Sequence, residues 1–273
     1  MNESDPKKQD EPVEEILRLL ACSELRNNLA KALRNGQKMT LSELSEKVGA
    51  SSPAAVHALR ELGKEQITHQ DEKRNYALTN IGEIVTRRFQ EVNTTITALT
   101  RNRDFWITHN LSDIPNHLLD KIGCLADTTI LTSAADDLFK VWSSFYMLLE
   151  NSKYIRGISP IFTGDLTPLF ERLASRNIDI ELIFTPAVLE ATLKTVDRKE
   201  LALALEKNLK IFTIKKQPNF ASTVTDYFLF MGFFRPDGLF DWTNGLLSQS
   251  PEALEWGREL YQYYAEKAEP VRL

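Results

Sequence analysis

The chain has 273 residues, of which 42% are hydrophobic and 26% are charged, and its net charge is −5. This length suggests two domains, and the composition is that of a soluble globular protein. Because DNA-binding chains are often basic, the acidic balance argues against a protein that only binds nucleic acid. It fits a small DNA-reading module joined to a larger acidic domain.

The two cysteines, Cys22 and Cys124, lie far apart among apolar residues. This favours buried free thiols in a reducing cytoplasm over a disulfide framework or a zinc site. The longest strongly apolar run, Tyr227 to Phe234, is far shorter than the roughly 20 residues that span a bilayer, so we expect no membrane segment. The polar first residues have no apolar core, so we expect no signal peptide and a cytoplasmic protein.

Residues 1–11 are polar and are predicted to be a disordered tail, followed by a DNA-binding domain over residues 12–80. Apolar residues at helical spacing run from Val13 to Leu33. Asn35-Gly36 then supplies the C-cap signal that ends this helical stretch.

Two further helices are predicted before residue 65. Thr40 and Glu43 have the spacing of a capping box, and Gly49 stops the helix that they begin. The next helix has Ser52 as N-cap and Pro53 at its first helical position. Two short strands then flank the charged turn at 71–74. This order of helices and hairpin is that of a winged helix-turn-helix.

The third helix must bury one face and offer the other to the major groove. Its helical projection places Val56, Leu59, Leu62 and Gly63 on the buried side. Arginine on the opposite side could read guanine, the N-terminal serines favour phosphate, and the turn of the wing suits phosphate or the minor groove. The residues expected to contact double-stranded DNA are Ser51, Ser52, Ala54, His57, Arg60, Lys64, Lys73 and Arg74.

A purely structural role for this module stays open. Residues 52–88 hold six Lys or Arg against five Asp or Glu, so the segment is only weakly basic. Similar helical patterns occur in domains that never touch DNA. A protein–protein adaptor is therefore an alternative to a regulator.

Residues 81–116 are predicted to be a linker helix and a connecting segment. Apolar residues in the helix follow a 4-3-4-3 spacing over about two heptads, fewer than a coiled coil needs. These residues are Val85, Phe89, Val92, Ile96 and Leu99. They could join two copies as a homodimer or pack on the second domain.

Residues 117–273 are predicted to form an α/β effector domain, because strand-like and helix-like segments alternate there. This alternation favours a mostly parallel sheet. The expected strands are 128–133, 154–162, 178–185, 209–215 and one or two within 220–234, and the expected helices are 136–151, 167–177, 197–208 and one that begins at 250–251.

Ligands of parallel sheets sit beyond the carboxyl ends of strands. Polar or aromatic residues at such ends make a candidate pocket for a small-molecule effector: Ser133, Ser159, Phe162, Thr225 and Asp226. The alternative is that the hydroxyl groups only cap helices.

No catalytic residues, cofactor or metal site are expected. All four histidines precede residue 118, so the α/β segment lacks imidazole, the commonest general base near neutral pH. No phosphate-binding or nucleophile-elbow motif occurs. Asp237 and Asp241 are interpreted as solvated loop carboxylates. An α/β enzyme remains an alternative that would need convergent carboxylates or a bound cofactor.

Six segments carry a resemblance that covers nearly the whole chain: LTNIGE (78–83), FWITHNLSDIP (105–115), YIRGISPIF (154–162), IELIFT (180–185), TVTDYFLFMGFF (223–234) and ALEWGRELYQYY (253–264). In them the chain resembles the winged-helix regulators of methanogenic archaea that carry a methanogenesis-regulator middle domain. The resemblance implies a transcriptional regulator whose second domain senses an effector.

The second domain is also distantly similar to the phospholipase-D-like sensor domain of archaeal sugar-responsive regulators. That enzyme fold uses an HxK motif, which this chain lacks after His117. The resemblance therefore implies a fold kept for binding.

Overall fold

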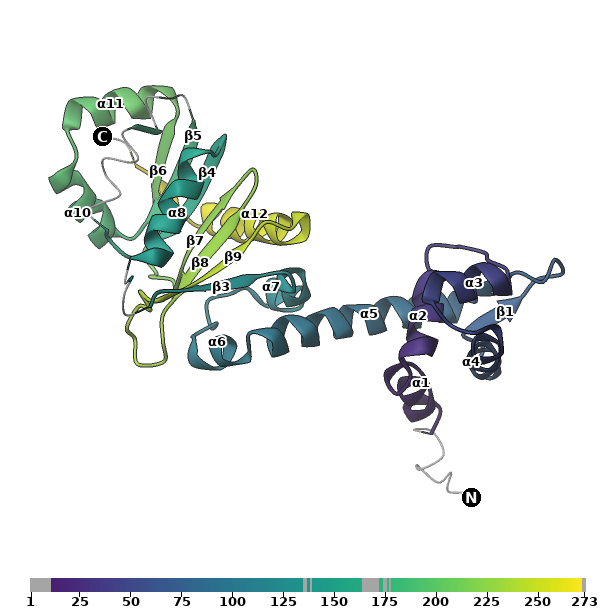
Figure 1. Ribbon diagram of the computed structural model, residues 1–273. Coiled ribbons are helices and arrows are strands. Elements are labelled where there is room, and N and C mark those ends of the chain that lie inside the picture. The colour runs from purple at the N-terminus through teal and green to yellow at the C-terminus, as the bar shows by residue number, and fades with distance from the viewer. Residues whose placement is uncertain are drawn as a thin grey trace, which may run out of the picture. The chain divides into compact units, whose positions relative to one another are not determined.

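The computed structural model describes residues 11–134, 137, 139–163, 172–173, 176 and 178–271. The chain forms two compact units, residues 1–93 and 94–273, which are described separately (Figure 1). The expected disordered tail lies outside the described residues except for Glu11, which begins the first helix. Among the helices described, none is both long and apolar enough to cross a bilayer.

The first unit has the predicted order of helices and hairpin. Its elements are α1 (Glu11–Ala21), α2 (Glu24–Ala32), α3 (Leu41–Val48), α4 (Ser52–Lys64), β1 (Thr68–Gln70), β2 (Tyr76–Leu78) and the start of α5 (Asn80–Arg101). The helical stretch predicted as continuous breaks at Cys22, because Ser23 caps a new helix by accepting a hydrogen bond from Arg26 N at 3.3 Å. This break leaves Cys22 exposed, contrary to the expected burial.

The helix caps follow the sequence closely. The capping box of Thr40 and Glu43 is confirmed, and Gly49 ends α3 with a left-handed φ of 67°. The N-cap of α4 is Ser51 rather than Ser52, a shift of one residue, and its side chain makes no capping hydrogen bond.

The second unit is an eight-stranded sheet covered by helices. Its helices are α6 (Arg103–Thr108), α7 (Asn116–Leu119), the 3-10 helix η2 (Ile122–Leu125), α8 (Lys140–Glu150), α10 (Pro186–Thr195), α11 (Arg198–Lys207) and α12 (Pro251–Ala265). Its strands are β3 (Thr129–Thr132), β4 (Tyr154–Ser159), β5 (Asp179–Phe184), β6 (Leu209–Thr213), β7 (Phe220–Thr225), β8 (Leu229–Phe233), β9 (Asn244–Ser248) and β10 (Glu269–Pro270). The helix expected over 167–177 lies largely outside the described residues.

The prediction of a mostly parallel sheet is wrong. The strand order is β10-β6-β5-β4-β7-β8-β9-β3, and only the β4–β5 and β5–β6 pairs are parallel. The segment 220–234 holds two strands joined by three residues, a connection that can only reverse the chain direction. The alternation of strands and helices therefore predicts the strand direction correctly only for β4, β5 and β6.

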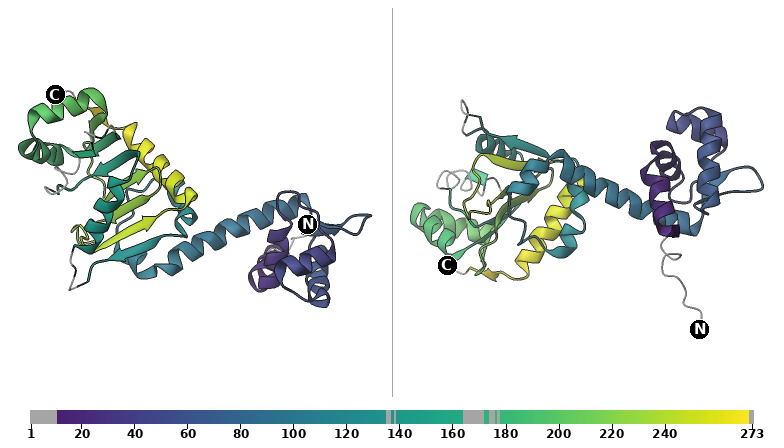
Figure 2. Two further views of the ribbon diagram at one scale, coloured as in Figure 1. Left: turned by 45° about the horizontal axis from the view of Figure 1, so that its top comes forward. Right: turned by 90° about the horizontal axis from the view of Figure 1, so that it is seen from below.

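Apolar residues on both faces of the sheet form two cores. Along β8, Leu229 and Met231 point into one core, and Phe230 between them points into the other. The first core contains residues of α6, α7, η2 and α12, and the second contains residues of α8, α10 and α11. Figures 1 and 2 show α8 and α12 on opposite faces.

The predicted linker over residues 81–116 is not a separate part. Val85 and Phe89 pack against the core of the first unit, and the boundary between the units falls after Asn93, within α5. Phe105 and Trp106 are buried in the first core of the second unit. The aromatic residues of the connecting segment therefore make it part of the second unit.

Candidate nucleic-acid interface

Helix α4 buries one face in its own unit. Ala55, Ala58, Leu59 and Leu62 are at most 5% exposed and belong to the core of the first unit. Gly63, expected on this face, is exposed instead. The helix is therefore fixed by small and branched apolar side chains, and its other face is left to solvent.

All residues predicted to contact DNA are exposed. On α4 and its N-terminus these are Ser51, Ser52, Ala54, His57, Arg60 and Lys64, and at the turn between β1 and β2 they are Lys73 and Arg74. The structure thus brings the predicted residues to two places, the exposed face of α4 and the tip of the hairpin.

The cations on α4 differ in how they are paired. Lys64 Nζ donates to Glu61 Oε1 at 2.8 Å, and this hydrogen bond lowers the pKa of Glu61. Within the described part of the chain, Arg60 forms no ion pair. The guanidinium of Arg60 is therefore the cation on this face that a partner can engage without breaking a contact.

The turn of the hairpin is held by Asp71. Its carboxylate accepts hydrogen bonds from the backbone N–H of Lys73 and Asn75 at 3.0 and 2.9 Å. The bond from Asn75 is the main reason that the pKa of Asp71 is lowered. Arg74 adopts a left-handed φ of 64°, and both Lys73 and Arg74 are exposed.

The hairpin and α4 are packed together. Thr68 on β1 donates its hydroxyl to Leu59 O of α4 at 3.4 Å. The hairpin itself projects beyond the helices, as Figures 1 and 2 show. The exposed face of α4 and the cationic turn therefore belong to the same compact unit.

The five residues predicted to bind an effector do not form one pocket. Because β7 is antiparallel to β4, the end of β7 at Thr225 and Asp226 lies next to the start of β4. Ser159 is at the other end of β4. Ser133 follows β3, and three strands lie between β3 and β4 in the sheet. Thr225 is fully buried and its hydroxyl accepts from the N–H of Phe228 at 3.1 Å, which is a turn-forming role. Phe162 is 37% exposed.

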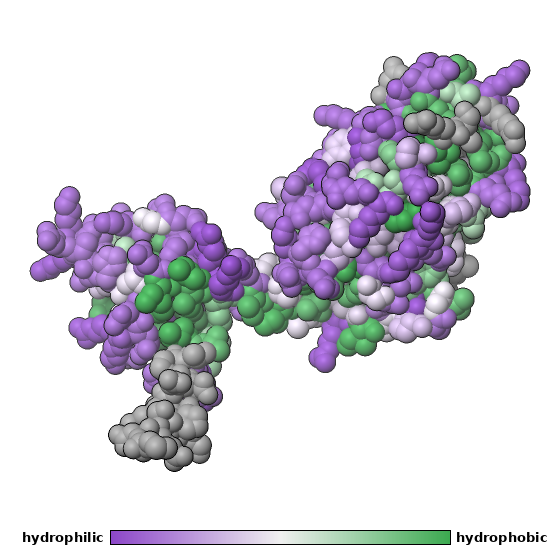
Figure 3. Space-filling model, turned by 180° about the vertical axis from the view of Figure 1, so that it is seen from behind, coloured by the Kyte–Doolittle hydropathy of each residue, from purple (hydrophilic) through white to green (hydrophobic). Residues whose placement is uncertain are grey.

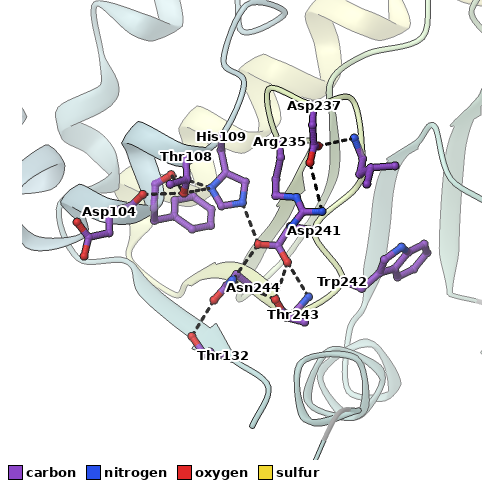
Figure 4. Close-up of polar contacts among 12 residues, drawn as sticks. Asp104, Thr108, His109, Thr132, Arg235, Asp237, Asp241, Trp242, Thr243 and Asn244 are labelled. Carbon is purple, nitrogen blue, oxygen red and sulfur yellow. Dashed lines mark hydrogen bonds and ion pairs between the residues drawn. The ribbon is translucent and has the colours of Figure 1, made fainter. Parts of the chain in front are cut away.

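A buried histidine–carboxylate pair lies in the second unit, because this unit begins at residue 94 and therefore includes His109, which precedes the segment predicted to lack imidazole. His109 follows α6, and its Nε2 lies 3.1 Å from Asp241 Oδ2, with both side chains at most 9% exposed (Figure 4). Asp241 was expected in solvent. The sequence signal that could have indicated a buried His109 is the aromatic pair Phe105-Trp106, which lies just before it.

Several hydrogen bonds surround this pair. Burial opposes the charge of Asp241, but hydrogen bonds from Thr243 and Asn244 outweigh it and lower its pKa to about 2. His109 Nδ1 lies 2.7 Å from Phe105 O, so both ring nitrogens face acceptor oxygens. Figure 4 shows these groups converging on the carboxylate. The pair anchors the segment after α6 to the loop before β9.

In the part of the chain that the structure describes, no three His, Cys, Asp or Glu side chains group closely enough to hold a metal ion.

Solved structures with similar shapes give weak matches. TrmBL2, described as an archaeal chromatin protein with a novel mode of DNA binding, aligns over 96% of this chain and 100% of its own, with 15% identity and a TM-score of 0.44. The S. aureus MepR–DNA complex aligns over 37% of this chain and 88% of its own, with 12% identity and a TM-score of 0.27. Scores this low establish neither fold nor activity.

Sequence comparison is more decisive. The methanogenesis regulatory protein FilR1 of Methanothrix harundinacea (strain 6Ac) is 25% identical over 257 residues, which is 92% of this chain. The chain spans 57% of the length of that relative. Residues 14–98 match the family model of the FilR1 N-terminal domain, and residues 138–267 match that of its middle domain. Because two domains of one regulator follow in order along most of the sequence, this chain belongs to the family of the methanogenesis regulatory protein FilR1.

Proposed function

We propose that this chain is a DNA-binding transcriptional regulator that reads promoter DNA with its winged helix. The observation that carries the proposal is the two-sided character of α4. One face is locked into the core by Ala55, Leu59 and Leu62, and the other presents His57 and Arg60. A recognition helix needs this division to enter the major groove without unfolding its own domain.

Each part of the surface has a distinct expected role. Arg60 reaches base edges, with guanine preferred, and the small side chain of Ala54 allows close approach. Ser51 and Ser52 lie at the N-terminus of α4, where backbone N–H groups attract phosphate. Lys73 and Arg74 bind the backbone or the minor groove from the hairpin turn.

Gel mobility shift with the DNA upstream of the protein's own gene tests this function. The wild-type chain is expected to shift this fragment. A variant with Arg60, Lys73 and Arg74 all changed to Ala is expected to lose binding. The matched control removes three exposed lysines of the second unit, Lys153, Lys194 and Lys207, and is expected to bind normally. Equal binding by both variants contradicts the proposal.

The protein is proposed to act as a homodimer, since two half-sites multiply a weak single contact. Of the predicted apolar seam, Val92 and Ile96 remain 53% and 52% exposed. The first unit also exposes Leu17, Ile81 and Ile84, and Figure 3 shows apolar surface on this unit. Val92 and Ile96, both on α5, are the proposed contact with a second copy.

The second unit is proposed to sense an effector rather than to catalyse a reaction, in a cytoplasmic protein. Support comes from the match of residues 138–267 to the middle domain of a regulatory protein. A phospholipase-D-like origin of the sheet, without the catalytic motif, belongs to the same proposal.

A further inference from the structure

A cavity of about 520 Å³ lies within the second unit, and none of the five residues predicted to bind an effector lines it. It opens where two parallel strands end: Thr213 closes β6, and Pro186 starts α10 directly after β5. This edge of a parallel sheet is where ligands of α/β proteins bind. Its volume is within the range of about 300–1,000 Å³ typical of small-molecule sites.

Three lysines line the cavity, and each is held differently. Lys216 Nζ is bonded to the carboxylate of Asp113, whose side chain is 4% exposed, and this bond raises the pKa of Lys216. Lys215 pairs with Glu269 at 3.2 Å, but both side chains are more than 70% exposed, so this pair is weak and easily exchanged.

Lys267 is the most available of the three. Its Nζ lies 3.4 Å from the centre of the Tyr263 ring, and among the described residues it forms no ion pair with a carboxylate. The aromatic ring positions the ammonium group without neutralising it. The N-terminus of α10, which contributes Pro186 to the wall, adds a partial positive charge.

The remaining wall is mixed, with polar groups from Ser112, Asn116, Thr213 and Glu269 beside apolar side chains. Ile114, Pro115, Ile214 and Tyr264 all line the cavity. Cations together with apolar side chains in one cavity match a molecule with an acidic head and a short hydrocarbon body.

We propose that this cavity binds a small organic acid, whose carboxylate contacts Lys215 and Lys267 and whose apolar body rests on Ile114 and Ile214. Lys216 stays with Asp113 and holds the wall in place. Residues 112–116 of that wall lie on the segment that leads from α5 and α6 to the sheet. On the proposed function, the cavity is therefore placed to pass an effector signal toward the DNA-binding unit.

Fluorescence titration of the full chain with 8-anilinonaphthalene-1-sulfonate, an aromatic anion, tests the site, with octanoate as competitor. The double variant Lys215→Gln and Lys267→Gln is expected to bind the probe about tenfold more weakly, because two charge-assisted contacts are lost. The matched control, Lys194→Gln with Lys207→Gln, changes the net charge equally outside the cavity and is expected to bind as the wild type does. Equal affinity of both double variants overturns the proposal.

A second arm separates organic acids from simple anions. Octanoate is expected to displace the probe at concentrations where inorganic phosphate does not, and equal displacement by phosphate overturns the organic-acid assignment. The same cavity variants are also tested for binding to the upstream DNA fragment without ligand. If the cavity variant still binds DNA and its affinity for the probe is unchanged, only the cavity proposal is refuted. If the wild-type chain does not bind the DNA fragment, the proposed function is refuted.

Discussion

At the scale of single residues, close packing explains why the LTNIGE segment has glycine at position 82. A Cβ atom at this position would lie 1.9 Å from the backbone oxygen of Ile67, so only glycine lets the start of α5 approach the hairpin. Thr79 bridges the same junction by donating to Gln66 O at 2.5 Å and accepting from Gly82 N at 2.9 Å.

Gly82→Ala is therefore expected to destabilise the first unit by about 1–3 kcal/mol or more, the cost of overpacking against rigid backbone. Urea unfolding followed by far-UV circular dichroism measures it. All four tryptophans lie beyond residue 94, so their fluorescence reports the second unit and should keep its midpoint. Gly63→Ala is the control, since its Cβ meets nothing nearer than 3.8 Å and alanine favours helix. Equal losses in both variants would refute the packing argument.

Asp241 gives a prediction with a defined pH dependence. Its pKa is about 2 in the folded protein, below the ordinary 3.8, so its carboxylate stabilises the fold above about pH 4. That stability is lost as the pH falls from 4 toward 2. Asp241→Asn is expected to cost about 2 kcal/mol at pH 6, and the gap to wild type should shrink below pH 4. Urea unfolding monitored by tryptophan fluorescence measures it, with exposed Asp237→Asn as control. A gap that stays constant from pH 6 to 2 contradicts this account.

At the scale of elements, α4 and the hairpin are expected to contribute differently to DNA recognition. Replacing His57 and Arg60 by Ala removes contacts to base edges, so sequence preference should relax. Replacing Lys73 and Arg74 by Ala removes phosphate contacts, so binding to all sequences should weaken alike. Competition binding with the upstream fragment and with random DNA separates the two effects. If the hairpin variant also changes the preference between sequences, the division of roles is wrong.

At the scale of the whole molecule, dimerisation and salt dependence are linked. With about four phosphate contacts per protomer, a dimer should show a log–log salt slope near −7, at about 0.9 per contact. Val92→Asp with Ile96→Asp places charges in the proposed contact and should yield a monomer, whose slope is about half as steep. Sedimentation and binding at several salt concentrations measure both. Leu203→Asp, at an apolar side chain of α11 that is 55% exposed, is the control. A double variant that stays dimeric rules out this face of α5.

The first unit was predictable because its structure is encoded over short distances. The capping box of Thr40 and Glu43, the left-handed Gly49 and the two-sided pattern of α4 each depend on residues within a few turns of helix. Errors there are small, such as the N-cap at Ser51 and the exposure of Gly63.

The second unit depended on contacts between distant parts of the chain. Strand direction was decided by pairing, so the antiparallel β7 carried Thr225 and Asp226 away from Ser159. His109 meets Asp241 across 132 positions of the chain, which no local pattern records. The same holds for the lysine-lined cavity, whose wall joins residues near 114, 186, 214 and 265. Periodicity and caps act between neighbours, whereas the edge of a sheet is assembled only when the chain has folded.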